Sequence, residues 1–118
     1  MERQRRGRGL GAPAVGEVIL VAFPYSDLSD FKLRPAVIVG KAEFKNLILC
    51  QITSKSGTSA IAIKIEDSDF EDGGLNRVSY VRPDKIFTAE PSIIEKRVGM
   101  LSAESCRKVR SVVRALFE

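Results

Sequence analysis

The sequence predicts one small, mainly β domain, an antiparallel barrel with a C-terminal helix packed against it. Several short runs of branched apolar residues are separated by proline, glycine and polar residues, which is the pattern of β-strands. No helical segments alternate with these runs, so parallel βαβ units are not expected. Only the last segment has the apolar spacing of an amphipathic helix. A chain of 118 residues is long enough for one modest core.

The first fourteen residues differ in composition from the rest of the chain. Residues 1–14 are rich in arginine and glycine and have little to bury, so we expect a disordered basic tail before a single domain over residues 15–118. Four arginines and one glutamate give this tail +3 of the formal net charge of +4. The positive charge is therefore mostly a property of the tail and is weak evidence about the domain.

The domain begins with two predicted strands, Glu17–Phe23 and Ala36–Val39, joined by a long polar loop. The loop ends at Arg34-Pro35. Proline restrains the residue before it to an extended backbone and is itself tolerated at the first position of a strand. We therefore expect Arg34 at the mouth of the second strand, where a forked, always-charged side chain is a candidate phosphate ligand.

The middle of the chain contains further short apolar runs and two polar connections. The runs predicted as strands are Asn46–Ile52, Ala60–Ile65, Arg77–Val81, Ile86–Thr88 and Ser92–Met100. A helical turn at the start of the last run is the alternative there. A hydroxyl-rich loop begins at Thr53. The acidic stretch after Ile65 is expected to be a solvated loop: a calcium loop starting at Asp67 would need glycine at its sixth position and glutamate at its twelfth, and neither is present. A second Arg-Pro pair, Arg82-Pro83, is followed by Asp84.

The last segment is predicted to be a helix. Ser102 is a suitable N-cap, and Glu104 in the first turn suits the positive end of the helix dipole. One apolar face is formed by Cys106, Val109, Val113 and Leu116, and Val112 and Phe117 widen it. The basic residues Arg107, Lys108, Arg110 and Arg114 lie mostly away from that face and are expected to be solvated.

Composition excludes several classes of site and location. The chain has no histidine, which excludes histidine-based triads and histidine metal sites. Cys50 and Cys106 form no CxxC motif and are expected to be buried, reduced thiols. We expect neither a metal nor another cofactor. No apolar run is long enough to cross a bilayer, and no signal peptide is evident, so a soluble cytoplasmic protein is expected.

The chain contains three blocks, GEVILVAFPYSDLSDFKLRPAVIV, ILCQITS and SYVRPDKIFT, before its predicted C-terminal helix. In this order and spacing they resemble the MazF/PemK (Kid) family of toxin endoribonucleases, in which a helical ending is also usual. The resemblance covers nearly all of residues 16–117. It implies an SH3-like barrel of the MazF/Kid/CcdB type, metal-independent cleavage of single-stranded RNA, inhibition by a protein antitoxin, and a homodimer.

The same resemblance implies which residues act. The arginine before proline matches Arg34, the threonine of the ITS block matches Thr53, and an Arg-x-Asp motif matches Arg82 and Asp84. Some members carry a histidine in the first loop, and this chain has none. Residues at the neighbouring loops are expected to contact RNA, and these are Tyr25, Ser26, Lys32, Ser54 and Lys55.

The chemistry of these side chains suits cleavage of RNA through its own 2′-hydroxyl. The enzyme must help to remove the hydroxyl proton and stabilise charge on the phosphoryl oxygens. The fork of Arg34 suits the oxygens, Thr53 has a hydroxyl to donate, and Asp84 is the candidate base, with Arg82 supporting it. The group that protonates the leaving oxygen is not identified by the sequence.

Structural alternatives exist for each candidate. Arg34 and Arg82 are alternatively surface arginines at strand starts, Thr53 a residue that satisfies loop backbone groups, and Asp84 a simple ion-pair partner. Phe23 and Tyr25 are both candidates for stacking on RNA bases, and Phe23 is alternatively a core residue. At the level of the whole protein, the alternative is a non-catalytic barrel of the same fold that binds nucleic acid or a protein target, as topoisomerase poisons of the CcdB type do.

Overall fold

A computed structural model describes residues 13–24, 31–57 and 59–118. Its strands are β2 (Glu17–Pro24), β3 (Phe31–Lys41), β4 (Leu47–Thr53), β5 (Ile63–Ile65), β6 (Phe70–Gly73), β7 (Ser79–Ala89) and β8 (Ile94–Leu101). Three 3-10 helices, η1 (Glu43–Lys45), η2 (Asp67–Asp69) and η3 (Pro91–Ile93), lie in the connections. One α-helix, α1 (Ala103–Ala115), follows β8.

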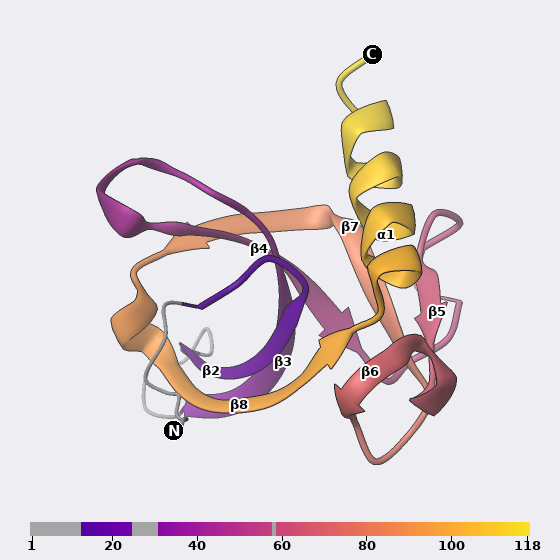
Figure 1. Ribbon diagram of the computed structural model, residues 1–118, viewed down its shortest axis with the longest axis horizontal. Helices are drawn as coiled ribbons and strands as arrows, with labels where there is room; N and C mark the ends of the chain where they lie inside the picture. Colours follow the sequence, from indigo (N-terminus) through magenta and orange to yellow (C-terminus); the bar gives the residue numbers. More distant parts are fainter. Residues whose placement is uncertain (1–12, 25–30, 58) are drawn as a thin grey trace.

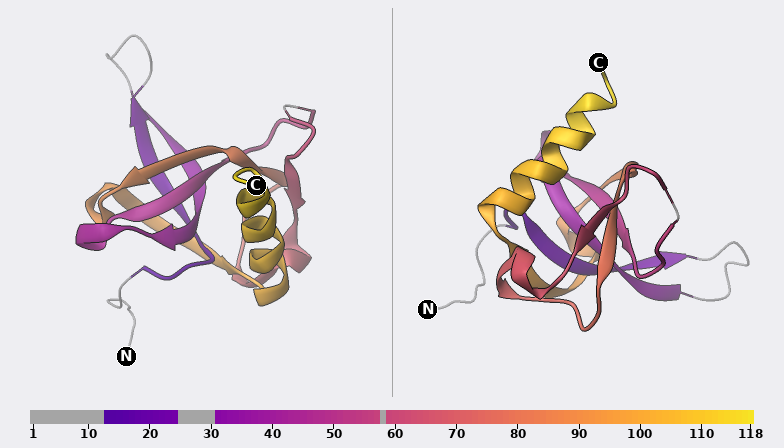
Figure 2. Two further views of the ribbon diagram at one scale, coloured as in Figure 1. Left: turned by 90° about the horizontal axis from the view of Figure 1, so that it is seen from above. Right: turned by 90° about the vertical axis from the view of Figure 1, so that its right-hand side faces the viewer.

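The seven strands form one antiparallel sheet in the order β5-β7-β4-β3-β2-β8-β6. The sheet curls into a half-barrel whose edges are β5 and β6 (Figure 1). The short strands β5 and β6 and the helix α1 lie together at one side of the molecule (Figures 1 and 2). The predicted fold class, a mainly β antiparallel barrel with a C-terminal helix, is confirmed.

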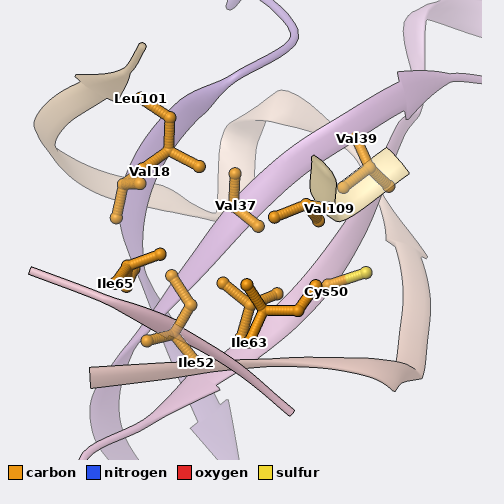
Figure 3. Close-up of a cluster of buried hydrophobic side chains, with 10 residues drawn as sticks. Val18, Val37, Val39, Cys50, Ile52, Ile63, Ile65, Leu101 and Val109 are labelled. Carbon is orange, nitrogen blue, oxygen red and sulfur yellow. The ribbon is translucent and has the colours of Figure 1, made fainter. Parts of the chain in front are cut away.

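The two faces of the sheet bury separate apolar clusters, because side chains alternate between faces along each strand. The helix-side core (Figure 3) consists of Val18, Val37, Val39, Cys50, Ile52, Ile63, Ile65, Val81, Leu101 and Val109. The barrel-side core consists of Ile19, Val21, Ala36, Ile38, Leu47 and Leu49. In β3, for example, Val37 belongs to the first cluster and its neighbours Ala36 and Ile38 belong to the second.

Helix α1 begins as the sequence predicts. The Ser102 side chain accepts a hydrogen bond from the Ser105 backbone N–H at 3.2 Å, and the Ser105 hydroxyl donates to Oδ1 of Asp69 at 2.8 Å. Val109 is 1% exposed in the helix-side core, a burial that stabilises the fold by about 2 kcal/mol. The predicted apolar face is buried at Val109, half-buried at Cys106, Val112 and Val113, and exposed only at the end of the helix. Leu116 is 41% exposed, because the far end of α1 projects past the sheet (Figure 1).

The strand that carries Arg34 is longer than predicted. Strand β3 begins at Phe31, so Arg34 and Pro35 lie inside it, opposite Val21 and Leu20 of β2. The expectation that Arg34 stands at a strand mouth is therefore wrong. The ladder between β3 and β4 begins only at Ala36, so Pro35 pairs with one neighbouring strand, as an edge proline does.

Strand β7 also differs from the prediction, because it joins two predicted strands and the loop between them. Consecutive residues Cys50 and Gln51 of β4 face Ile86 and Arg82 of β7. Residues 83–85 therefore form a bulge, which is a place where a strand tolerates proline. Arg82 and Asp84 lie within a continuous strand at this bulge and not at a loop mouth.

The acidic stretch is only partly the solvated loop that was expected. It forms η2, whose Glu66 and Asp69 make a reciprocal capping box, and then the edge strand β6. β6 ends at Gly73, which has φ +65°, and a Cβ there would clash with the Val98 carbonyl oxygen. Glycine is therefore required where β6 meets β8.

Two other predicted ranges are shortened or shifted. The predicted strand over residues 60–65 is reduced to β5 (Ile63–Ile65). The one over residues 92–100 begins with a helical turn, η3, which was the alternative there, and continues as β8. Ala14, the last residue of the predicted tail, donates its backbone N–H to Oε1 of Glu17 at 2.7 Å. Residues 1–12, and with them the predicted disorder of the tail, lie outside the described residues. The domain boundary at residue 15 stays a prediction.

Candidate active site

The barrel-side face of the sheet changes from apolar to polar toward one end. Along β4, Leu47 and Leu49 are buried on this face, and Gln51 and Thr53 continue it because side chains alternate. Along β3, the same face carries Ile38 and Ala36 and then Arg34. The apolar core therefore stops at Ala36 and Leu49, and the polar candidates lie directly beyond it.

Strand register brings the polar residues of β4 and β7 together. Gln51 is paired with Arg82, and Thr53 is paired with Tyr80. These four residues form a two-by-two block on one face, about 5 Å apart across the strands and about 7 Å apart along them. All four are half-buried, whereas Cys50, Ile52 and Val81 on the other face are fully buried.

Arg34 lies beside this block on the next strand. Ala36 of β3 pairs with Gln51, so continuing the antiparallel register by two residues places Arg34 next to Thr53. The structure thus brings all four predicted catalytic residues, Arg34, Thr53, Arg82 and Asp84, to one end of one face of the sheet.

Arg82 and Asp84 form a bidentate ion pair on β7. Nε of Arg82 donates to Oδ1 of Asp84 and Nη2 donates to Oδ2, each at 3.2 Å. The Arg82 side chain is 16% exposed and the Asp84 side chain 39%. The hydrogen bonds from Arg82 lower the pKa of Asp84, and the nearby positive charges of Arg82 and Lys85 act in the same direction. Asp84 is therefore ionised at neutral pH and holds the guanidinium of Arg82 in a fixed plane.

Thr53, the last residue of β4, makes a local hydrogen bond. Its Oγ1 accepts from the backbone N–H of Lys55 at 3.2 Å. A hydroxyl that accepts this bond keeps its own hydrogen to donate. The arrangement fixes the oxygen at the end of β4 while leaving Thr53 a donor toward a bound ligand.

The predicted RNA-contacting residues fall into two groups. Lys32, Ser54 and Lys55 are exposed at the same end of the sheet as the four candidates. Tyr25 and Ser26 lie outside the described residues. Sequence reasoning missed Gln51 and Tyr80, although the alternation in ILCQITS and SYVRPD places them on the faces of Thr53 and Arg82.

The cysteines lie elsewhere. Cys50 is fully buried in the helix-side core, as predicted, whereas Cys106 is only half-buried. Burial raises the pKa of the Cys50 thiol to about 11, and the negative charge of Asp84 adds to the effect. Cys50 is therefore a neutral thiol at physiological pH and not a nucleophile.

Two further observations concern residues 13–24, 31–57 and 59–118. No group of three or more His, Cys, Asp or Glu side chains in these ranges is placed to hold a metal ion. No helix formed by them is long and apolar enough to cross a membrane.

Comparison with known proteins identifies a family and a shared fold. A family model described as PemK-like, MazF-like toxin of type II toxin–antitoxin system matches residues 14–117. A search of curated proteins finds no significant match.

Solved structures with the same fold include three from bacteria. An endoribonuclease in complex with its cognate antitoxin, from a mycobacterial species, is 17% identical with a TM-score of 0.67, over 92% of this chain and 95% of that one. MazE–MazF (Form-II) from Deinococcus radiodurans is 18% identical with a TM-score of 0.70, over 91% and 96%. The Mycobacterium tuberculosis toxin MazF-mt6 is 19% identical with a TM-score of 0.61, over 84% and 95%.

Proposed function

This chain belongs to the family of PemK-like, MazF-like toxins of type II toxin–antitoxin systems, and we propose that it is an endoribonuclease that cleaves single-stranded RNA without a metal ion. Proteins of the same fold are named as endoribonucleases, which supports the activity. We also propose that it acts in the cytoplasm, where messenger RNA, the expected substrate, is found.

One observation carries the proposal: Arg34, Thr53 and the Arg82–Asp84 pair lie on three consecutive strands at the polar end of one face. Two guanidinium groups and a hydroxyl at this spacing suit the two non-bridging oxygens and the leaving oxygen of one phosphodiester. The single carboxylate of this set already accepts two hydrogen bonds from Arg82, which is a poor donor set for a divalent cation.

In the proposed reaction the 2′-oxygen forms a bond to the adjacent phosphorus and the bond from phosphorus to the 5′-oxygen breaks. Asp84 accepts the proton of the 2′-hydroxyl, and the leaving 5′-oxygen takes up a proton from solvent. Arg34 and Arg82 stabilise the charge that develops on the phosphoryl oxygens, and Thr53 donates a hydrogen bond to the same group. The products are a 2′,3′-cyclic phosphate and a 5′-hydroxyl.

The test is incubation of the purified chain with a long single-stranded RNA, with and without excess EDTA. Cleavage should be equal in the two samples, and single-stranded DNA of the same sequence should remain intact because it lacks the attacking hydroxyl. The variant Arg82→Ala, purified in the same way, is the control for contaminating nuclease. A contaminating nuclease would cut the RNA equally well in the wild-type and variant preparations. Loss of cleavage in EDTA, or cleavage of the DNA, would refute the mechanism.

An antitoxin is the expected protein partner, and structural neighbours are titled as complexes with MazE or a cognate antitoxin. We propose that an antitoxin segment covers the polar end of the sheet and places acidic groups near Arg34 and Arg82. Hydrogen exchange of the complex should show protection of residues 32–34, 51–55 and 80–84. Protection confined to α1, with RNA binding unchanged, would contradict occlusion of the site.

A further inference from the structure

The polar end of the sheet extends past the catalytic candidates onto the edge strand β5. Tyr80 of β7 is paired with Thr53 on one side and with Lys64 of β5 on the other. Together with Arg34, these residues make one row across four adjacent strands, β3, β4, β7 and β5. Three strand spacings of about 4.8 Å separate the two ends of the row, or about 14 Å.

Tyr80 lies on the same face as Thr53 and Arg82. Its neighbours Ser79 and Val81 are buried on the opposite face, whereas Tyr80 is half-buried. A phenol ring between two polar strand positions buries one part of its surface and presents the rest to solvent. Such a ring is a platform for stacking a base of single-stranded RNA.

Lys64 is an exposed residue between two buried ones. Ile63 and Ile65 are 7% and 1% exposed in the helix-side core, so Lys64 projects from the other face, the face of Tyr80. Within the described part of the chain Lys64 forms no ion pair. Its ammonium group therefore continues the positive charge of Arg34 and Arg82 to the edge of the sheet.

We propose that Tyr80 and Lys64 form an RNA-binding subsite in which Tyr80 stacks on the base of a nucleotide next to the reacting phosphate and Lys64 binds a phosphate beyond it. The proposal rests on the proposed function for the position of the reacting phosphate. The order of side chains along the row supports the proposal. Arg34 and Thr53 are placed for the reacting phosphate, and the ring of Tyr80 and then the ammonium group of Lys64 follow. Phosphates and bases alternate in the same way along a single-stranded RNA.

The experiment measures binding apart from cleavage. A 2′-O-methyl RNA, which has no free 2′-hydroxyl, is titrated with the full chain while fluorescence anisotropy is recorded at several salt concentrations. Tyr80→Leu removes the ring and Tyr80→Phe keeps it. Lys64→Gln removes one charge from the subsite. Lys41→Gln removes one charge from the opposite end of β3, seven residues from Arg34 and so about 23 Å away.

The subsite predicts a distinct result for each variant. Tyr80→Leu should weaken binding by roughly tenfold or more and Tyr80→Phe by little, as expected for stacking on one base. Lys64→Gln should reduce the slope of log Kd against log salt by about 0.7, the value for one phosphate of a single strand, and Lys41→Gln should not change it. Circular dichroism establishes whether each variant is folded. If Tyr80→Leu does not fold, the result for Lys64→Gln decides, because this substitution is at an exposed residue.

Failure of this inference is distinguishable from failure of the proposed function. Equal affinity and equal salt slopes for wild type and the folded Tyr80 and Lys64 variants would overturn the subsite, whatever the protein does to RNA. If the wild-type chain binds the 2′-O-methyl RNA through Tyr80 and Lys64 but leaves ordinary RNA intact, the endonuclease proposal falls and the subsite stands.

Discussion

Arg34, Thr53, Arg82 and Asp84 are the positions where a buried sheet face becomes polar, and this placement determines what each side chain can do. A half-buried arginine has lost part of its hydration and interacts more strongly with a phosphate than an exposed one does. Asp84 is fixed by two hydrogen bonds to Arg82 before any substrate binds. Preorganised charge of this kind is suited to a transition state.

The variant Arg34→Lys separates stabilisation of charge from attraction of RNA. Lysine keeps the positive charge but lacks the planar fork that can hold two phosphoryl oxygens. We expect near-normal RNA binding and cleavage slower by roughly a hundredfold or more, the usual loss when a donor to developing charge is removed. Single-turnover cleavage and anisotropy on the same preparation measure both quantities. Equal losses of binding and cleavage in a folded variant would make Arg34 mainly a binding residue.

The ion pair with Arg82 makes a prediction about the pKa of Asp84. Because its hydrogen bonds to Arg82 favour the ionised form, the carboxyl should titrate below the ordinary aspartate value of about 3.9. Asp84 then stays ionised, and so able to accept a proton, down to that lowered pKa. Activity that depends on the Asp84 carboxylate is lost only as pH falls through this pKa. In Arg82→Gln the pKa should rise toward the ordinary value. A ¹³C NMR titration of the Asp84 carboxyl measures the shift directly, and identical values in both proteins would contradict the role of the pair.

Residue types in the site were predictable from short patterns, but their neighbours were not. The Arg-Pro pairs and the ITS block identified Arg34, Thr53 and Arg82 in the sequence. Gln51 looked like part of an apolar run, and Tyr80 like a strand residue. Their position beside the candidate residues depends on the pairing of β4 with β7, which is a contact between distant segments of the chain.

At the scale of elements, the bulge in β7 is the feature that the sequence could not reveal. Its residues 83–85 read as a break between two strands, because Pro and Asp are depleted in strands. In the fold, the flanking apolar residues of β7 both pair with β4, so the strand continues and the irregular residues are pushed out of the ladder. That bulge contains Asp84 and adjoins Arg82, and bulges are often found next to active sites.

One arginine connects three strands at the other side of the sheet. Arg97 of β8 donates to Glu17 of β2 and, through Nη2, to both carboxylate oxygens of Asp72 in β6 at 3.2 Å. The Glu17 side chain is only 12% exposed. Removing the arginine leaves a mostly buried carboxylate without its charged partner, so Arg97→Met should lower the free energy of unfolding by about 1–2 kcal/mol.

Asp72→Asn is the matched control for this connection. The Asp72 side chain is 55% exposed, so its ion pair with Arg97 is screened by solvent and the loss should be below about 0.5 kcal/mol. Urea unfolding of both variants measures the two values. Equal stabilities for Arg97→Met and wild type would show that Glu17 is satisfied without the arginine.

At the scale of the whole molecule, the half-barrel leaves apolar side chains at its surface. Leu33 is 50% exposed, Val78 39% and Phe117 78%. The family resemblance leads us to predict a homodimer, and exposed apolar residues such as Leu33 are candidates for its interface. Sedimentation velocity at micromolar concentration should give a dimer, and a monomer with full activity would contradict the prediction.

The fold class was predictable from the sequence because it depends on the pattern and composition of residues, whereas a dimer interface depends on the shape of the folded surface.

The most direct test of metal-independent cleavage at the polar end of the sheet uses a substrate that lacks one 2′-hydroxyl group. An RNA oligonucleotide with one mapped cleavage site is compared, in excess EDTA, with the same oligonucleotide carrying one 2′-deoxynucleotide on the 5′ side of the scissile phosphate. We predict that the all-RNA strand is cut to a 2′,3′-cyclic phosphate and a 5′-hydroxyl and that the substituted strand remains intact at that site. Cleavage of the substituted strand at the same phosphate would contradict attack by the 2′-hydroxyl.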